Sequence, residues 1–155
     1  MQGTLAKPTL DQARRLLATA GLPSGDLDES LFEYFVASYK GRSAVALGGA
    51  EVFDGVALLR SVVTHPGRRR EGRATAIVRF IEQRLANAGV RDIYLLTESA
   101  AAVFAGWGYR TIGRNAAPPP IAASRQFTTL CPERAQLMHK TLATHGIPPR
   151  REGLG

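Results

Sequence analysis

The sequence predicts one α/β domain, built on a mostly antiparallel mixed sheet with one parallel pair of strands and flanked by helices. Residues 43–53 and 56–64 are apolar runs joined by Asp54-Gly55, a dipeptide typical of tight hairpins. Residues 75–88 repeat apolar side chains at helical spacing. The apolar run 91–97 follows that helix, so it should return parallel to residues 56–64 through a right-handed crossover.

The elements before this core have local signals of their own. Thr9 is a suitable N-cap for an amphipathic helix from Leu10 to Ala20, which Gly21 ends. Residues 24–30 are polar and acidic, which favours a loop. The aromatic run 31–39 is then expected to be the first of three antiparallel strands.

After the parallel strand, a short helix over Ser99 to Ala105 should lead through a glycine turn into a strand that starts near Tyr109. Prolines in residues 116–120 cannot donate ladder hydrogen bonds, which indicates a linker or a polyproline turn. A short helix over 121–127 and a final strand over 135–142 complete the prediction. We expect the domain to span residues 1–145 and the tail 146–155, rich in glycine, proline and charge, to be mobile.

The composition fits a compact domain, because 155 residues with 45% hydrophobic content are enough for one core. No apolar stretch approaches the roughly 18 residues of a membrane span, and the N-terminus lacks a signal-peptide pattern. We therefore expect a cytoplasmic protein without a membrane partner. The single cysteine, Cys131, excludes an internal disulfide and argues against a thiol-based metal cluster, so no metal is expected.

The loop between the strand 56–64 and the helix 75–88 is basic and contains glycine. It reads Arg68-Arg69-Arg70-Glu71-Gly72-Arg73-Ala74, and a strand therefore delivers arginines and backbone N–H groups to a helix N-terminus. Such a site suits a di-anionic phosphate. The Gly-x-x-x-x-Gly-Lys-Ser/Thr and Gly-x-Gly-x-x-Gly patterns are both absent, which excludes a P-loop nucleotidase and leaves a dinucleotide fold without its fingerprint.

The formal charge of +7 has to be located before it is interpreted. Four arginines lie in this loop, which leaves 7 − 4 = +3 for the remainder, and no nucleic-acid-binding motif is recognisable. We expect no nucleic-acid partner and interpret the other arginines as a solvated face. A nucleic-acid-binding protein stays an alternative, and it would need the loop arginines free.

The pattern Arg69-x-x-Gly72-x-Ala74 resembles the Gln/Arg-x-x-Gly-x-Gly/Ala motif of the GNAT N-acetyltransferase superfamily. The segment Phe104-Ala105-Gly106-Trp107-Gly108-Tyr109 resembles that family's second landmark, which lies one helix and one strand further on. The resemblance implies a sheet whose parallel pair splays apart, acetyl-CoA as co-substrate, and direct acetyl transfer to a small-molecule amine. It also allows a homodimer formed through the C-terminal segment.

The resemblance assigns cofactor positions residue by residue. The pantetheine arm would pair with Val62, Val63 and Thr64, and the pyrophosphate would bind the backbone N–H groups of the loop. That set comprises Arg69, Arg70, Glu71, Gly72, Arg73 and Ala74. Phe104, also beside the cofactor, stands where many members have a tyrosine that protonates the thiolate, and it has no proton to give. Ser61, Thr97 or solvent could replace that tyrosine.

An acyl transfer to an amine needs a base, commonly a carboxylate with a raised pKa. Glu51, inside the apolar run 44–53, is the first candidate, although alternation could place it on a solvated face. Glu98, just after the strand 91–97, is the second, although it could equally be an early-helix acid favoured by the dipole. Arg60 could bind a substrate carboxylate, or it could be solvated or bridged to an acidic neighbour.

A narrower resemblance concerns Leu58-Leu59-Arg60-Ser61-Val62, the strand at Tyr94, and the tail from Phe127 to Met138. These segments are similar to N-acetyltransferase-fold proteins encoded in bacterial arsenic-resistance operons, which implies a role in detoxification. Cys131 invites an arsenic-binding hypothesis, but a lone thiol coordinates metalloids poorly and is more often a small buried hydrophobe. A catalytically weak acetyl-CoA-binding module is the alternative function, because it would share the loop and lack the base.

Overall fold

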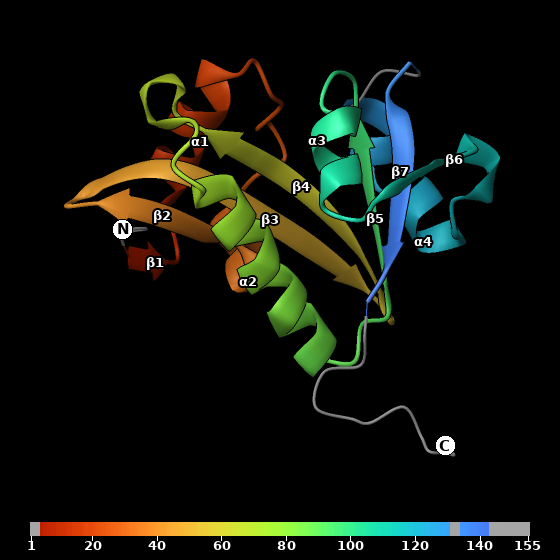
Figure 1. Cartoon of the computed structure of the whole chain (residues 1–155). Coiled ribbons are helices and arrows are strands. Elements are labelled where there is room, and N and C mark those ends of the chain that lie inside the picture. Colours follow the sequence, from red (N-terminus) through yellow and green to blue (C-terminus); the bar gives the residue numbers. More distant parts are fainter. Residues whose placement is uncertain (1–3, 131–133, 143–155) are drawn as a thin grey trace.

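The computed structural model describes residues 4–130 and 134–142 and contains a seven-stranded sheet in the order β1-β2-β3-β4-β5-β7-β6 (Figure 1). Among the described strands only β4 and β5 pair in parallel. The strands are β1 (Thr4–Ala6), β2 (Val36–Lys40), β3 (Ser43–Phe53), β4 (Val56–Thr64), β5 (Asp92–Thr97), β6 (Arg110–Ile112) and β7 (Gln136–Thr141). The predicted α/β class with a mostly antiparallel sheet is confirmed.

The helices lie on both faces of this sheet. They are α1 (Leu10–Thr19), α2 (Arg73–Asn87), α3 (Ala101–Gly106) and α4 (Pro119–Ala122), together with 3₁₀ turns at Glu29–Tyr34, Pro66–Arg68 and Arg114–Ala116 and a π turn at Gln126–Leu130. Thr9 caps α1 as predicted, because its side chain accepts from the Gln12 amide and the Gln12 side chain accepts from the Thr9 amide. Asp54 and Gly55 form the predicted hairpin turn, with φ of 50° and 92°.

The sheet opens between its two halves. Strands β4 and β5 pair only from Val56 to Leu58, although β5 continues alongside β7 to Thr97 and β4 continues alongside β3 to Thr64. In Figure 1 the two strands meet at one end and diverge towards the other. The backbone edges of β4 and β5 that face one another beyond Leu58 are therefore available to a ligand.

A bulge marks the diverging part of β4. Gly49 pairs with Arg60 and Leu47 with Val63, so two β4 residues, Ser61 and Val62, lie opposite the single residue Gly48. Ser61 has φ of 62°, a left-handed conformation that is uncommon for a residue with a side chain. Bulges bend and twist a strand, which is consistent with the departure of β4 from its parallel neighbour.

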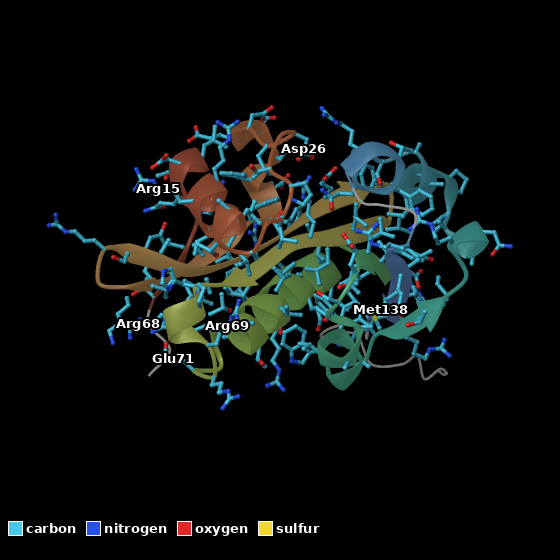
Figure 2. The ribbon with its side chains drawn as sticks, turned by 90° about the horizontal axis from the view of Figure 1, so that it is seen from above. Arg15, Asp26, Arg68, Arg69, Glu71 and Met138 are labelled. Atoms are coloured by element: carbon cyan, nitrogen blue, oxygen red, sulfur yellow. The ribbon has the colours of Figure 1, made fainter. Side chains whose placement is uncertain are left out.

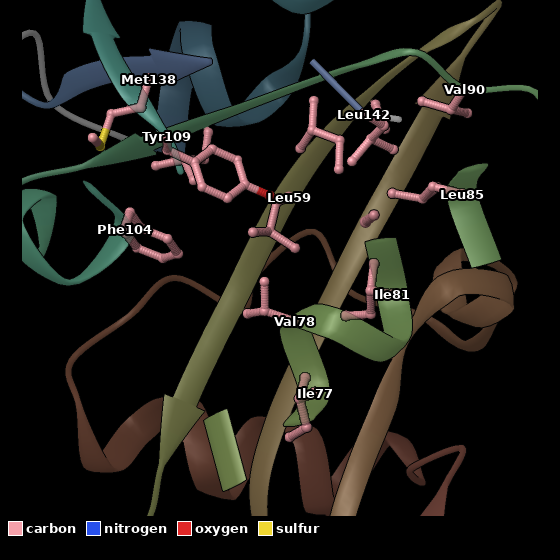
Figure 3. Close-up of a cluster of buried hydrophobic side chains, with 14 of the residues drawn as sticks. Leu59, Ile77, Val78, Ile81, Leu85, Val90, Phe104, Tyr109, Met138 and Leu142 are labelled. Carbon is pink, nitrogen blue, oxygen red and sulfur yellow. The ribbon is translucent and has the colours of Figure 1, made fainter. Parts of the chain in front are cut away.

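Two apolar clusters cover the opposite faces. Side chains of α2, among them Ile77, Ile81 and Leu85, pack with Leu59 and Tyr109 on one face (Figure 3). On the other face Leu16 and Leu17 of α1 pack with Phe32, Phe35 and Leu47. Both strands that border the opening are therefore held by packed helices.

Several element predictions were wrong in detail. The three-residue strand β1 was not predicted, and the run 31–39 starts within a 3₁₀ turn and becomes strand β2 only at Val36. Helix α2 begins at Arg73, two residues before the predicted start. Pro119 and Pro120 do not form a linker but open α4, because proline suits the first turn of a helix. The predicted helix 121–127 ends at Ala122, and Cys131 and the tail 146–155 lie outside the described residues.

Candidate active site

A cleft of about 720 Å³ lies where β4 and β5 diverge. Its walls come from Leu59 to Thr64 of β4, Leu95 to Thr97 of β5, and the segment Ala20–Pro23 after α1. A second cavity of about 390 Å³ lies at the start of α2 and shares Val62, Val63, Thr64 and Phe104 with the first. The two cavities therefore form one path from the helix N-terminus into the opening of the sheet.

The start of α2 has the features of an anion-binding site. Gly72 is its N-cap, with a left-handed φ of 75° and no side-chain cap, so the amides of Ala74 and Thr75 have no partner within the helix. Both residues line the smaller cavity together with Gly72 and Arg73. The amides and the helix dipole thus converge on one point with no side chain from Gly72 to obstruct it.

Arg70 has an exposed side chain and takes φ of 70°, as a glycine would. Arg70 also lines the smaller cavity. Arg69 lines both cavities. Figure 2 shows Arg68, Arg69 and Glu71 gathered beside the start of α2.

Arg73 plays a different part from the other three arginines of the loop. Its side chain is 5% exposed, and it donates from Nε to Glu71 Oε1 at 2.7 Å and from Nη1 to Ser38 Oγ at 2.8 Å. The hydrogen bond from Arg73 lowers the pKa of Glu71. Arg73 therefore anchors the loop to β2, and what it offers to the cavity is its backbone amide.

Three of the four predicted catalytic residues lie together. Ser61, Thr97 and Glu98 all line the larger cleft, from opposite sides of the opening. Thr97 Oγ1 accepts from the Ala100 amide at 3.0 Å, and the Glu98 carboxylate, 45% exposed, accepts from Arg134 Nε at 2.9 Å. Glu51 is not among the residues that line the cleft.

Glu51 instead contacts Arg60. Arg60 Nη1 donates to Glu51 Oε2 at 2.6 Å, and the guanidinium is also paired with Asp26 through both of its Nη atoms, one of them at 2.8 Å from Asp26 Oδ1. Of the two interpretations left open for Arg60, the bridge to acidic neighbours is the one observed. A substrate carboxylate at Arg60 would have to compete with these two carboxylates.

Sequence reasoning did not find Asp26. Burial alone would raise its pKa, but the hydrogen bonds and the charge of Arg60 outweigh that effect and lower the pKa below its usual 3.8. Asp26 lies 34 positions before Arg60 in a segment that reads as a polar loop, so the sequence carried no signal of the pair.

Phe104 is buried and lines both cavities, and its ring packs edge-on against Trp107 and Tyr109. Tyr109, 2% exposed, donates to Glu82 Oε2 at 2.8 Å, and burial followed by the charge of Glu82 raises its pKa. Tyr109 is therefore a core aromatic and no proton donor for the cleft.

No group of three or more His, Cys, Asp or Glu side chains able to hold a metal occurs in the described part of the chain. Within the same residues, none of the helices has the length and apolar character to cross a membrane.

The sequence model of the acetyltransferase (GNAT) family matches residues 8–109, more than half of the chain. The chain belongs to the GNAT acetyltransferase family. It is thus an acetyl-CoA-dependent N-acetyltransferase by family, as the resemblance in the sequence implied. The cavity at the uncapped start of α2 and the open edge of β4 fit a CoA molecule, which carries a pyrophosphate and an amide-containing arm.

Solved GNAT structures share this fold. N-acetylglutamate synthase from Neisseria gonorrhoeae, complexed with coenzyme A and N-acetyl-glutamate, matches 92% of the chain with a TM-score of 0.75 and 12% identity, and the chain spans 36% of that protein. The ribosomal-protein-S18-alanine N-acetyltransferase from Escherichia coli matches 92% of this chain and 96% of its own, with a TM-score of 0.68 and 18% identity.

An aminoglycoside 6'-N-acetyltransferase complexed with coenzyme A matches 90% of the chain and 97% of its own, with a TM-score of 0.68 and 18% identity. At these identities the likeness shows the fold alone. No protein of curated function matches this GNAT chain in sequence.

Proposed function

We propose that this protein moves an acetyl group from acetyl-CoA directly to the amine of a small molecule. The amine nitrogen attacks the thioester carbonyl carbon, a C–N bond forms and the C–S bond breaks; the nitrogen loses one proton to a base, and the departing thiolate takes up one proton. The observation that carries the proposal is the cleft between β4 and β5, which continues into the cavity at the uncapped start of α2.

The pantetheine arm would lie along β4 at Val62, Val63 and Thr64, where β4 has left its parallel neighbour. The pyrophosphate would accept from the backbone amides between Arg69 and Ala74. Gly72 supports this placement, because a side chain at the N-cap would stand between the phosphate and the helix amides.

Glu98 is the base that we propose, acting directly or through water. It lines the cleft just after the end of β5, whereas Glu51 does not line the cleft; each carboxylate is paired with an arginine, Glu98 with Arg134 and Glu51 with Arg60. Glu51 stays a candidate whose contribution has to be measured beside that of Glu98. Glu98→Gln should lower kcat at least about a hundredfold if the carboxylate removes the proton, since general bases contribute about 10² to 10⁴. Glu51→Gln is the matched comparison.

The acceptor that we propose is a small amine, in a detoxification role connected with arsenic or toxic amino acids. The narrower sequence resemblance supports the arsenic context. The names of the structural neighbours refer to N-acetylation of glutamate, of an alanine of ribosomal protein S18 and of an aminoglycoside, which supports the reaction class. The cytoplasmic location and the homodimer stay predictions.

The experiment combines binding and turnover. Acetyl-CoA should raise the melting temperature, with a stabilisation that grows as RT ln(1 + [L]/Kd). Thiol release is then measured with L-glutamate, putrescine, kanamycin, a phosphinic amino acid and an arsenic-containing amino acid. Release with one of these amines supports the proposal, and absence of any stabilisation by acetyl-CoA would refute it.

The alternative is a catalytically weak acetyl-CoA-binding module. Phe104 favours it, because the residue at the usual tyrosine position cannot protonate a thiolate. Stabilisation by acetyl-CoA without thiol release from any amine of the panel would support the module.

A further inference from the structure

The polar cluster formed by Asp26, Arg60 and Glu51 lies beside the larger cleft, which Arg60 lines. The three side chains are 5%, 1% and 18% exposed, so all three charges are largely removed from water. Figure 2 places Asp26 on the side of the sheet that carries α1, away from Arg68 and Arg69. These two arginines belong to residues 68–74, which we name the phosphate loop. The cluster is therefore distinct from the residues expected to hold the cofactor.

Burial of such a cluster is not a general source of stability. Removing charged groups from water is costly, and apolar residues of similar size often stabilise a protein as well or better. The geometry nevertheless uses almost every donor of Arg60: Nε donates to Ser61 Oγ at 3.1 Å, and the two Nη atoms donate to Asp26 and Glu51. The cluster thus joins three separate segments at one point.

The segments that it joins are parts of the cleft. Asp26 belongs to residues 20–28, which we name the acceptor loop, and Ala20 to Pro23 of that loop line the cleft. Ser61 is part of the β4 bulge and also lines the cleft. Glu51 belongs to β3, which pairs with β4 on the side away from the opening. The Asp26–Arg60 pair is thus a tie between the acceptor loop and β4.

We propose that Arg60 is a positioning residue that fixes the acceptor loop relative to the β4 bulge and thereby sets the width and shape of the acceptor site. Arg60 itself does not contact the reacting atoms. Its fork holds the Asp26 carboxylate from two directions, which sets orientation as well as distance. This proposal rests on the proposed function, because it concerns the site at which the amine would bind.

The first test needs no substrate. Hydrogen exchange of backbone amides is measured by mass spectrometry for peptides that cover residues 20–28 and, as a reference, residues 69–76. Asp26→Asn and Arg60→Lys should each speed exchange in the acceptor loop and leave the reference peptide unchanged. Asp11→Asn is the matched control, because it removes the same charge from an ion pair with Arg15 whose side chains are 71% and 81% exposed.

Unchanged exchange in the acceptor loop of both variants would overturn the proposal, whatever the outcome of the activity assays. Arg60→Lys keeps the positive charge but loses the fork, and Asp26→Asn keeps the shape of the side chain, so at least one folded variant is expected. This readout remains informative even if no amine of the panel is acetylated, which separates failure of this proposal from failure of the proposed function.

The second test is kinetic and uses the best amine of the panel. Loss of a charge-assisted hydrogen bond typically corresponds to about a tenfold to hundredfold effect. We expect Asp26→Asn to raise KM for the amine by about that factor while KM for acetyl-CoA changes less than about twofold. Equal increases in both KM values, or no increase in either, would overturn the positioning role.

Discussion

Gly49 of β3 is the position at which one added methyl group has the most predictable effect. An ideal Cβ there would lie 2.4 Å from two ring carbons of Phe35, whereas unstrained carbon contacts are about 3.5 to 4.0 Å. Phe35 is 1% exposed and stacked on Phe32 with ring centroids 4.9 Å apart, so its ring cannot move away without disturbing the core beneath α1. Gly49→Ala should therefore strain a packed core.

Overpacking of this kind costs about 1 to 3 kcal/mol. For a chain of this length each kcal/mol corresponds to about 2 to 4 °C, so Gly49→Ala should lower the melting temperature by roughly 2 to 12 °C. Because Gly49 pairs with Arg60, the variant should also raise KM for the amine. Calorimetry and steady-state kinetics measure the two effects.

Gly106→Ala is the matched control, since an added Cβ there meets nothing within 4 Å and the residue ends α3 on the surface. Alanine is the better helix former, so this variant should be stabilised by about 0.5 to 1 kcal/mol. A Gly49→Ala protein that melts at or above the wild-type temperature would show that Phe35 does not pack against β3 as described.

Three further predictions concern the site. Gly72→Ala places a side chain at φ of 75°, a backbone conformation that costs about 1 to 2 kcal/mol for a residue other than glycine. Acetyl-CoA should therefore bind roughly tenfold more weakly, as measured by calorimetric titration. Unchanged affinity would contradict the proposal that this loop binds the pyrophosphate. Phe104→Tyr places a phenol where both cavities meet and should raise kcat in a thiol-release assay; an unchanged kcat would indicate that the thiolate is protonated elsewhere. The pKa of Asp26 is lower in the folded protein than its usual 3.8 in the unfolded chain. The ionised carboxylate therefore stabilises the fold at pH values above 3.8, and this contribution is lost as the pH falls through the lower pKa of the folded state. The free energy of unfolding of Asp26→Asn should therefore fall below wild type near neutral pH and approach it below about pH 4, and a constant difference in urea titrations would argue against the ion pair.

The sequence predicts best those elements whose signals are local. Strands β3 and β4 have the predicted bounds, because Asp54-Gly55 can adopt the left-handed conformations that a tight hairpin needs. The cap of α1 depends only on Thr9 and Gln12, which are close in sequence, and the start of α2 depends on the left-handed conformation of Gly72. The loop before α2 could be located from sequence for the same reason, since its geometry depends on a few consecutive residues, and its phosphate-binding role stays a prediction.

Features that depend on distant partners could not be predicted. Strand β1 has three residues and exists by pairing with β2. The contact between Asp26 and Arg60 joins positions 34 apart, and the position of Glu51 beside Arg60 follows from the register of β3 on β4. Periodicity could place Glu51 on a face of the sheet, but it could not show that a buried guanidinium occupies that face.

The opening of the sheet connects these observations. A parallel pair that stayed in register beyond Leu58 would bond the edges of β4 and β5 to each other and leave no acceptor site. Here a bulge at Ser61 lies in the diverging part of β4, apolar clusters pack on both faces, β4 stays paired with β3, and β5 stays paired with β7. Two arginines then secure the surroundings on opposite sides of β4: Arg73 ties the phosphate loop to β2, and Arg60 ties the acceptor loop to the bulge. The cleft is thus a consequence of how β4 is held, and substitutions that alter this support should change substrate binding without touching the substrate.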